Sequence, residues 1–162
     1  MNKDEKLNNL RAEIIKEVFI KNWNEVWFYP EFNGVKGWKG TGDIIFLGLN
    51  PATTNFGGFN DSLYYESLKK FGFKDAHLTD IFKIRQTNKN TDDLVENKEL
   101  LKKSKEYLIE EIDILKPKLI VFLGKNVEKI YKMVLPEVRI RAIRIGHYSY
   151  RYKPRGILRK KW

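Results

Sequence analysis

The sequence contains no cysteine. Disulfide bridges, thiolate nucleophiles and iron–sulfur or zinc sites with cysteine ligands are therefore excluded. Long hydrophobic runs are also missing, and stretches such as Leu119–Leu123 are far too short to span a bilayer. The first residues, Met1–Lys6, are polar and charged, and no apolar segment typical of a secretory signal follows them. We expect a cytoplasmic protein that does not bind membranes.

Positive charge is what the sequence has in excess. The 162 residues include 31 Lys and Arg against 21 Asp and Glu, which gives a formal net charge of +10 at pH 7. Such a surplus favours a polyanionic partner, either nucleic acid or an anionic membrane surface, although a basic surface can also serve solubility alone. The length fits a single domain over residues 1–162, without internal repeats, low-complexity tracts or linkers.

The spacing of apolar residues predicts helices that alternate with strands. Four helices are predicted: one that buries Leu7, Leu10, Ile14 and Val18, one over about 61–71, one that buries Leu101, Leu108, Ile112 and Leu115 and stops before Pro117, and one from Gly124 to about Met133. Strands are predicted over 44–49, 76–81, 119–123 and 140–145. The alternation of apolar and Arg residues in 140–145 indicates a strand with one covered face. This order points to an α/β sandwich with a mainly parallel sheet.

A glycine-rich segment, residues 34–42, precedes the first predicted strand. It is not a dinucleotide-binding fingerprint, because those glycines lie between a strand and the helix that follows it. We interpret it as a loop, and whether it touches phosphates is open.

Three polar residues follow predicted strands. Asn50 comes after the first strand, Asp80 closes the second, and His147 follows the last. Ligands of open parallel sheets bind beyond the carboxyl ends of the strands, so these residues are expected to converge on one crevice. The alternative for His147 is a histidine packed in a tyrosine-rich loop.

Four segments carry a more specific pattern. They are Asp43-Ile-Ile-Phe-Leu-Gly-Leu-Asn50-Pro51, Leu78-Thr79-Asp80-Ile-Phe-Lys83, Lys116-Pro117-Lys118-Leu-Ile-Val-Phe-Leu-Gly124 and Gly146-His147-Tyr148-Ser149. In order and spacing they resemble the signature segments of the uracil-DNA glycosylase superfamily, in its Gly-x-Asn-Pro branch without an iron–sulfur cluster. The resemblance implies a three-layer sandwich with a central four-stranded, mainly parallel sheet flanked by helices.

The resemblance also implies a mechanism. A nucleotide would be flipped out of DNA into the crevice, because the glycosidic bond cannot be reached inside the base stack. By this analogy His147 donates a hydrogen bond to the base oxygen where negative charge grows, and Asn50 positions the attacking water. The motif around Asn50 implies base contacts from Gly48, Leu49 and Pro51. Phe56, or else Phe59, would stack on the base, although either ring could instead be a core residue.

The C-terminal segment supports DNA as the partner. From Val138 to Trp162 there are nine Lys and Arg residues and no carboxylate side chain, with Tyr148, Tyr150 and Tyr152 among them. Cations can neutralise phosphates while a ring fills the gap left by a flipped base. The residues expected to contact DNA are Ser149, which the resemblance assigns to a phosphate, together with Tyr150, Arg151, Lys153 and Arg155.

Three positions depart from the family's pattern. Ala52 stands where many relatives carry glycine, and Tyr148 where proline is usual. Asp80 stands where many relatives carry an asparagine that reads the base edge. An ionised aspartate only accepts hydrogen bonds, whereas uracil presents both a donor and an acceptor. Asp80 is therefore protonated, or serves as a general base, or the preferred base is not uracil.

The sequence thus predicts a monofunctional DNA glycosylase that removes a deaminated base in base excision repair. We expect a monomer that acts without a metal ion or other cofactor, with Asn50, His147 and Asp80 as the catalytic residues. Two alternatives remain: a non-catalytic nucleic-acid-binding protein with the same fold, and a hydrolase of free nucleotides or nucleosides.

Overall fold

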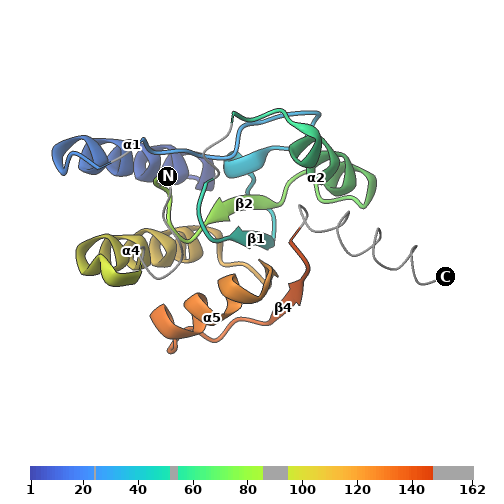
Figure 1. Cartoon of the computed structure of the whole chain (residues 1–162). Helices are drawn as coiled ribbons and strands as arrows, with labels where there is room; N and C mark the ends of the chain where they lie inside the picture. The colour runs from blue at the N-terminus through green and yellow to red at the C-terminus, as the bar shows by residue number, and fades with distance from the viewer. Residues whose placement is uncertain (24, 52–54, 86–94, 148–162) are drawn as a thin grey trace.

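A computed structural model describes the chain except for residues 24, 52–54, 86–94 and 148–162 (Figure 1). Its elements, in chain order, are α1 (Lys3–Ile20), the 3₁₀ helix η1 (Gly37–Lys39), β1 (Ile44–Gly48), α2 (Phe59–Lys70), β2 (His77–Asp80), α4 (Lys98–Leu115), β3 (Leu119–Leu123), α5 (Lys125–Val134) and β4 (Ala142–Ile145). The predicted helices and strands are therefore present, with boundaries that differ by one or two residues.

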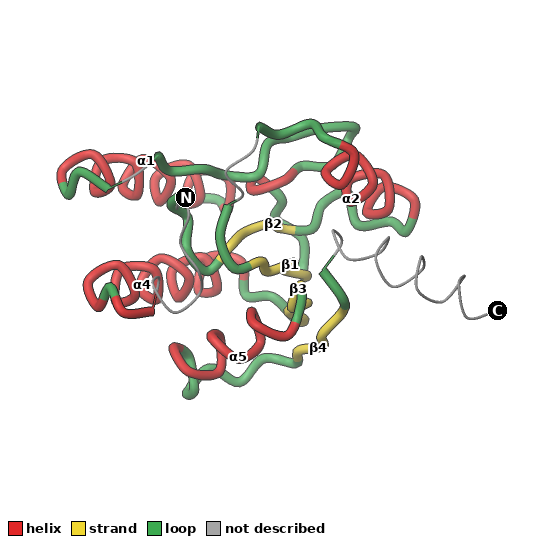
Figure 2. The backbone as a smooth tube through the Cα atoms, in the orientation of Figure 1, coloured by secondary structure: helices red, strands yellow, loops and turns green. Residues whose placement is uncertain are grey.

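The four strands form one sheet in the order β2-β1-β3-β4, and every pair of neighbours is parallel (Figure 2). Each connection between strands carries helical structure, as a parallel sheet requires. Strands β1 and β3 are almost completely buried because they lie in the middle of the sheet. Their continuous apolar sequence reflects cover on both faces. The predicted α/β sandwich is confirmed.

One face of the sheet is covered by α4 and α5. Side chains alternate between the two faces along a strand, so His77 and Thr79 of β2 point to the same side. Both contact Glu111 of α4. Phe122, on the same face, packs on Tyr131 of α5 with ring centroids 4.9 Å apart. Helix α1 lies beside α4 in the antiparallel sense, since its first turn reaches the C-terminal end of α4 (Figure 1).

The opposite face is covered by α2. Phe46, the central side chain of β1 on this side, packs against Tyr64 of α2 and against Phe73. The ring centroids are 6.5 and 5.5 Å apart, respectively. Because Asp80 follows Thr79 in β2, it points to this face as well. The three layers of the predicted sandwich are thus helices, sheet and helix, and Asp80 lies between the sheet and the α2 layer.

One local expectation is wrong. The strand over 140–145 was expected to have one covered face, but in β4 the residues 142–144 are all exposed. Ile143 retains 45% of its accessible surface, because β4 is an edge strand and Ile143, in register with Val121, lies on the face opposite to α5. The glycine-rich segment is a loop, as predicted, and it contains η1. The loop is tightly packed: a Cβ at Gly40 would overlap the carbonyl of Ala76, and Trp38 is buried.

Within the described ranges, no helix has the length and apolarity needed to cross a bilayer.

Candidate active site

The carboxyl ends of the strands bring the predicted site residues to one edge of the sheet. Gly48, the last residue of β1, is the register partner of Asp80, the last residue of β2. On the other side of the sheet, Leu123 of β3 pairs with Ile145 of β4, and His147 follows two residues later. Neighbouring strands are about 4.8 Å apart, so the ends of β1 and β4 are separated by about 10 Å.

Asp80 is the most buried of the three predicted catalytic residues, with 4% of its surface accessible. Its Oδ1 accepts a hydrogen bond from the Tyr29 hydroxyl at 3.3 Å. A Cβ added to Gly48 would overlap this same oxygen, so a larger residue here would have to displace the carboxyl group. Burial raises the pKa of Asp80 to about 7, against the opposing effects of the Lys83 charge and the Tyr29 hydrogen bond. Near neutral pH this carboxyl is therefore partly protonated.

Asn50 lies two residues beyond the end of β1 and is half-buried. Its Nδ2 donates to the carbonyl oxygen of Pro51 at 3.2 Å, which orients the side chain. Pro51 itself is buried, and Leu49 is half-buried and packs against the core. The segment that carries the Gly-x-Asn-Pro pattern is thus held by packing at the sheet edge, and the Asn50 amide has a defined direction.

His147 lies beside the end of β3. The backbone N–H of Gly124 donates to Ile145 at 2.9 Å, and a Cβ on Gly124 would be 3.8 Å from the Cβ of His147. Burial lowers the pKa of His147, because the charged ring loses hydration. At neutral pH the ring is accordingly neutral, with one N–H to donate and one nitrogen to accept.

The two aromatic candidates occupy different environments. Phe56 is half-buried in a cluster of rings, with centroid distances of 6.2 Å to Trp27, 5.5 Å to Phe32 and 5.3 Å to Tyr65. Trp27 in turn contacts Tyr29, the partner of Asp80, at 4.7 Å. The aromatic cluster therefore extends from Phe56 to the Asp80 carboxyl. Phe59 begins α2 and is 68% exposed.

Several predicted residues lie outside the described part of the chain. These are Ala52, Tyr148, Ser149, Tyr150, Arg151, Lys153 and Arg155. The roles predicted for them remain predictions.

The structure adds residues that the sequence reasoning did not place in the site. Tyr29 contacts Asp80, and Lys83 and Glu111 form an ion pair below it. Lys83 lies within one of the family-like segments, so its position could have been suspected. Nothing in the sequence near Tyr29 or Glu111 distinguishes them from the other tyrosines and glutamates of the chain.

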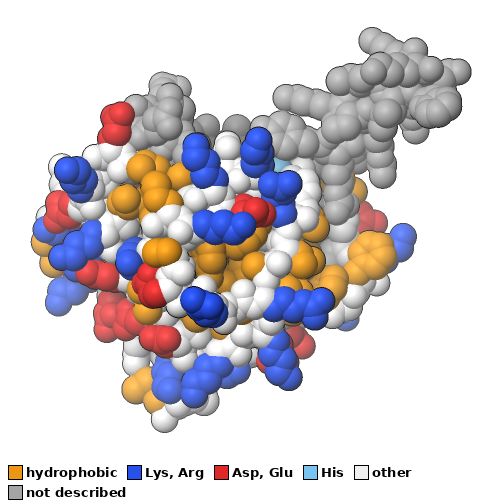
Figure 3. Space-filling view, turned by 90° about the horizontal axis from the view of Figure 1, so that it is seen from below, with side chains coloured by type: hydrophobic (Ala, Val, Ile, Leu, Met, Phe, Trp, Pro, Cys, Tyr) orange, Lys and Arg blue, Asp and Glu red, His pale blue; other side chains and the backbone are white. Residues whose placement is uncertain are grey.

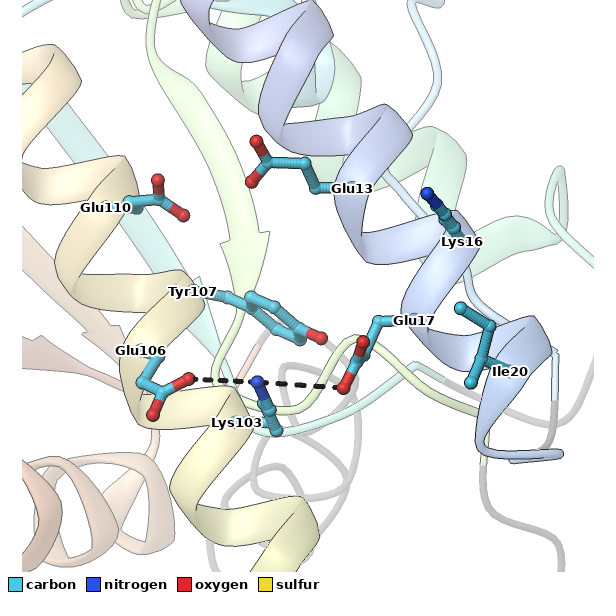
Figure 4. A pocket seen from close by; sticks show the side chains of 8 residues that line it. All are labelled: Glu13, Lys16, Glu17, Ile20, Lys103, Glu106, Tyr107 and Glu110. Atoms are coloured by element: carbon cyan, nitrogen blue, oxygen red, sulfur yellow. Dashed lines mark ion pairs between the residues drawn. The ribbon is translucent and has the colours of Figure 1, made fainter.

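A surface groove of about 450 Å³ lies between α1 and α4 (Figure 4). Four glutamates line it, and Lys103 bridges two of them, Glu17 at 3.6 Å and Glu106 at 3.4 Å. The acidic lining repels phosphates, so the groove does not suit a nucleic acid.

Among the described residues, no three His, Asp or Glu side chains lie together as a metal-ligand set. Comparison with known families gives a match to the Uracil DNA glycosylase superfamily over residues 39–161. The chain belongs to this superfamily. Comparison with curated proteins finds no match. The matched range begins just before β1 and includes Asn50, Asp80 and His147, so the candidate site lies inside the region that defines the family.

Proposed function

We propose that the chain is a DNA glycosylase that flips a deaminated base, uracil or a related base, out of DNA and hydrolyses its N-glycosidic bond in base excision repair. One observation carries this proposal. A buried carboxyl that is partly protonated near neutral pH lies at the edge of the sheet where an amide and a neutral imidazole also emerge. These groups offer both donors and acceptors to a base.

In this mechanism the bond between C1′ and the base nitrogen breaks, and its electron pair leaves with the base. The neutral ring of His147 donates its N–H to the base oxygen on which negative charge collects. Donors aimed at such developing charge contribute about 3–4 kcal/mol to transition-state stabilisation. Asn50 holds a water molecule whose oxygen bonds to C1′ as its proton leaves to solvent. Phe56 offers a ring on which the flipped base stacks.

Asp80 reads the edge of the base in its protonated form. A protonated carboxyl has one O–H donor and one carbonyl acceptor, like the asparagine amide found in many relatives. The Tyr29 hydroxyl donates a hydrogen bond to Oδ1 of Asp80, and Gly48 leaves the space that this oxygen occupies. The proton resolves the mismatch between a carboxylate and the uracil carbonyl.

Phosphate contacts are assigned to the C-terminal residues Ser149, Tyr150, Arg151, Lys153 and Arg155. On the face that Figure 3 shows, lysine and arginine side chains are spread among acidic and apolar ones and form no single continuous patch. The concentration of cations after Val138 in the sequence supports a DNA contact. We propose that the protein binds DNA as a monomer without a cofactor.

Incubation with a uracil-containing oligonucleotide, followed by alkali, is expected to cleave the strand at the uracil position, because an abasic site is alkali-labile. A matched oligonucleotide with thymine should stay intact. Binding without cleavage, for uracil, hypoxanthine and xanthine alike, would instead identify a non-catalytic DNA-binding protein. Release of the base from free deoxyuridine at a comparable rate would indicate a nucleoside hydrolase.

DNA affinity is expected to fall steeply with salt, with a log–log slope of about −0.9 for each phosphate neutralised. Replacing Arg151, Lys153 and Arg155 together with serine should reduce the magnitude of the slope by up to about 3. The measurement is a titration of binding to duplex DNA at several salt concentrations. A control variant changes three exposed lysines on α1 and α4 to serine, Lys6, Lys16 and Lys102, and should keep the slope. Equal slopes for the tail variant and the wild type would contradict the assignment.

A further inference from the structure

Glu111 is a fully buried carboxylate in the middle of the α4 face of the sheet. Its Oε1 accepts from Trp38 Nε1 at 2.8 Å and from Thr79 Oγ1 at 2.7 Å, and His77 Nε2 lies 3.0 Å away. Its Oε2 is 2.6 Å from Lys83 Nζ. Burial alone would raise the pKa of Glu111, but the Lys83 charge and the hydrogen bonds from His77 and Lys83 outweigh it and lower the pKa to about 2. Glu111 is therefore ionised at neutral pH.

Lys83 connects this carboxylate to the candidate site. Its ammonium group donates to the backbone carbonyl oxygen of Asp80 at 2.8 Å, in addition to the ion pair with Glu111. The side chain is 2% exposed, so water replaces neither contact. One cation thus joins α4 to the last residue of β2, and it acts on Asp80 both through the backbone and through its charge.

The buried ion pair between Lys83 and Glu111 adds little to the stability of the fold. Taking two charges out of water costs several kcal/mol for each ion, and well-packed apolar side chains are often at least as stable. The pair instead acts on the neighbouring carboxyl. Lys83 favours the charged form of Asp80, while the more distant charge of Glu111 disfavours it.

Four elements contribute the groups that bear on Asp80. Lys83 follows β2 and Glu111 lies on α4, while Tyr29, in the segment before η1, donates to the carboxyl itself. His77 of β2 acts through its contact with Glu111. Burial raises the pKa of Asp80, and among these groups the charge of Lys83 lowers it most. The charge of Glu111 has the smallest effect on this pKa.

We propose that Lys83 is a positioning residue that fixes the end of β2 and the charge state of Asp80, and that Glu111 is the residue that holds Lys83 in place. The inference rests on the proposed function only in that Asp80 reads the base. The pair gives Asp80 a proton affinity suited to neutral pH, where the site can present both a donor and an acceptor.

The titration of the Asp80 side-chain carboxyl by carbon-13 NMR tests this inference in the full-length protein without DNA. The Asp80 signal is identified by its absence in Asp80→Asn. Its midpoint, near pH 7 in the wild type, is expected to rise in Glu111→Gln, because Lys83 loses the carboxylate that holds it and the effect of Lys83 on Asp80 is larger than that of the Glu111 charge. In Lys83→Met it should rise by at least about one pH unit, because the favourable cation is lost. If Glu111 acted on Asp80 only through its own charge, Glu111→Gln would instead lower the midpoint.

Lys83→Met leaves Glu111 buried without its cation, so this variant could unfold. The double variant Lys83→Met with Glu111→Gln removes both charges, and its midpoint should lie above that of the wild type because the Lys83 effect is the larger one. Glu106→Gln, an exposed change on the same helix, should leave the midpoint unchanged. Coincident midpoints in all variants, or a midpoint that falls in Glu111→Gln, would overturn the inference. Because the titration needs no catalysis, absence of base excision would contradict the proposed function and leave this result intact.

Discussion

Replacing Asn50 or His147 with alanine is expected to slow base release by at least about a hundredfold while DNA affinity changes little. Interactions that strengthen only in the transition state affect the chemical step and not ground-state binding. His147 meets that condition because the charge on the base oxygen grows only as the glycosidic bond breaks. Asn50 meets it because its water becomes useful only when C1′ turns electron-poor.

The measurement is a single-turnover rate on a uracil oligonucleotide, together with an equilibrium titration of DNA binding. Asn55→Ala, an exposed asparagine five residues after Asn50, serves as the control and should retain the wild-type rate. Thermal unfolding of each variant separates loss of chemistry from loss of fold. Wild-type rates in both site variants would show that the chemistry takes place elsewhere.

Much of the fold could be predicted because its signals are local. The continuous apolar runs that became β1 and β3 are typical of strands covered on both faces, and Pro117 marked the end of α4. The edge strand β4 was harder to interpret, because alternation along a strand does not reveal whether another element covers its apolar side. Ile143 is apolar and yet exposed.

The candidate site was predictable to the extent that it consists of strand ends. Asn50, Asp80 and His147 follow strands, and parallel strands bring their carboxyl ends to one edge. The residues behind them were not predictable in this way. Glu111 is a charged residue next to the apolar positions that predict α4, yet it is fully buried because Lys83, His77, Thr79 and Trp38 surround it. Partners from three separate segments, η1, β2 and the residues after β2, leave no local pattern in the sequence.

Asp80→Asn is expected to raise uracil excision relative to the excision of hypoxanthine and xanthine, by roughly ten- to a hundredfold above pH 7. The ionised carboxylate faces the uracil carbonyl without a donor, and a misplaced buried hydrogen-bond partner costs about 1–3 kcal/mol. The asparagine amide supplies donor and acceptor at every pH with almost no change in volume. Single-turnover assays on oligonucleotides that carry each base measure the ratio.

The same role for Asp80 predicts how the rate of uracil excision depends on pH. Because burial raises the pKa of Asp80 to about 7, the wild type should excise uracil best below pH 7 and lose rate as pH rises through that value. Asp80→Asn should lack this loss. Stability should follow the same group: between about pH 4 and pH 7 the folded state holds a proton that the unfolded state has released, so the free energy of unfolding falls as pH rises. The free energy of unfolding of Asp80→Asn should therefore increase relative to that of the wild type as pH rises across that window, by up to about 4 kcal/mol.

The competing role for Asp80 is that of a general base that activates water, and the same substitution separates the two. A base must be ionised, so its rate would rise as pH increases through about 7, and Asp80→Asn would abolish cleavage of every base alike. A reader of the base edge gives the opposite pH profile and a change in preference with excision retained. A uniform loss would assign Asp80 to catalysis by proton abstraction, and an unchanged preference with an unchanged pH profile would place it outside the site. The burial of Asp80 beside Gly48 and Tyr29 favours the reading role, because burial stabilises the protonated carboxyl, the form that has both a donor and an acceptor.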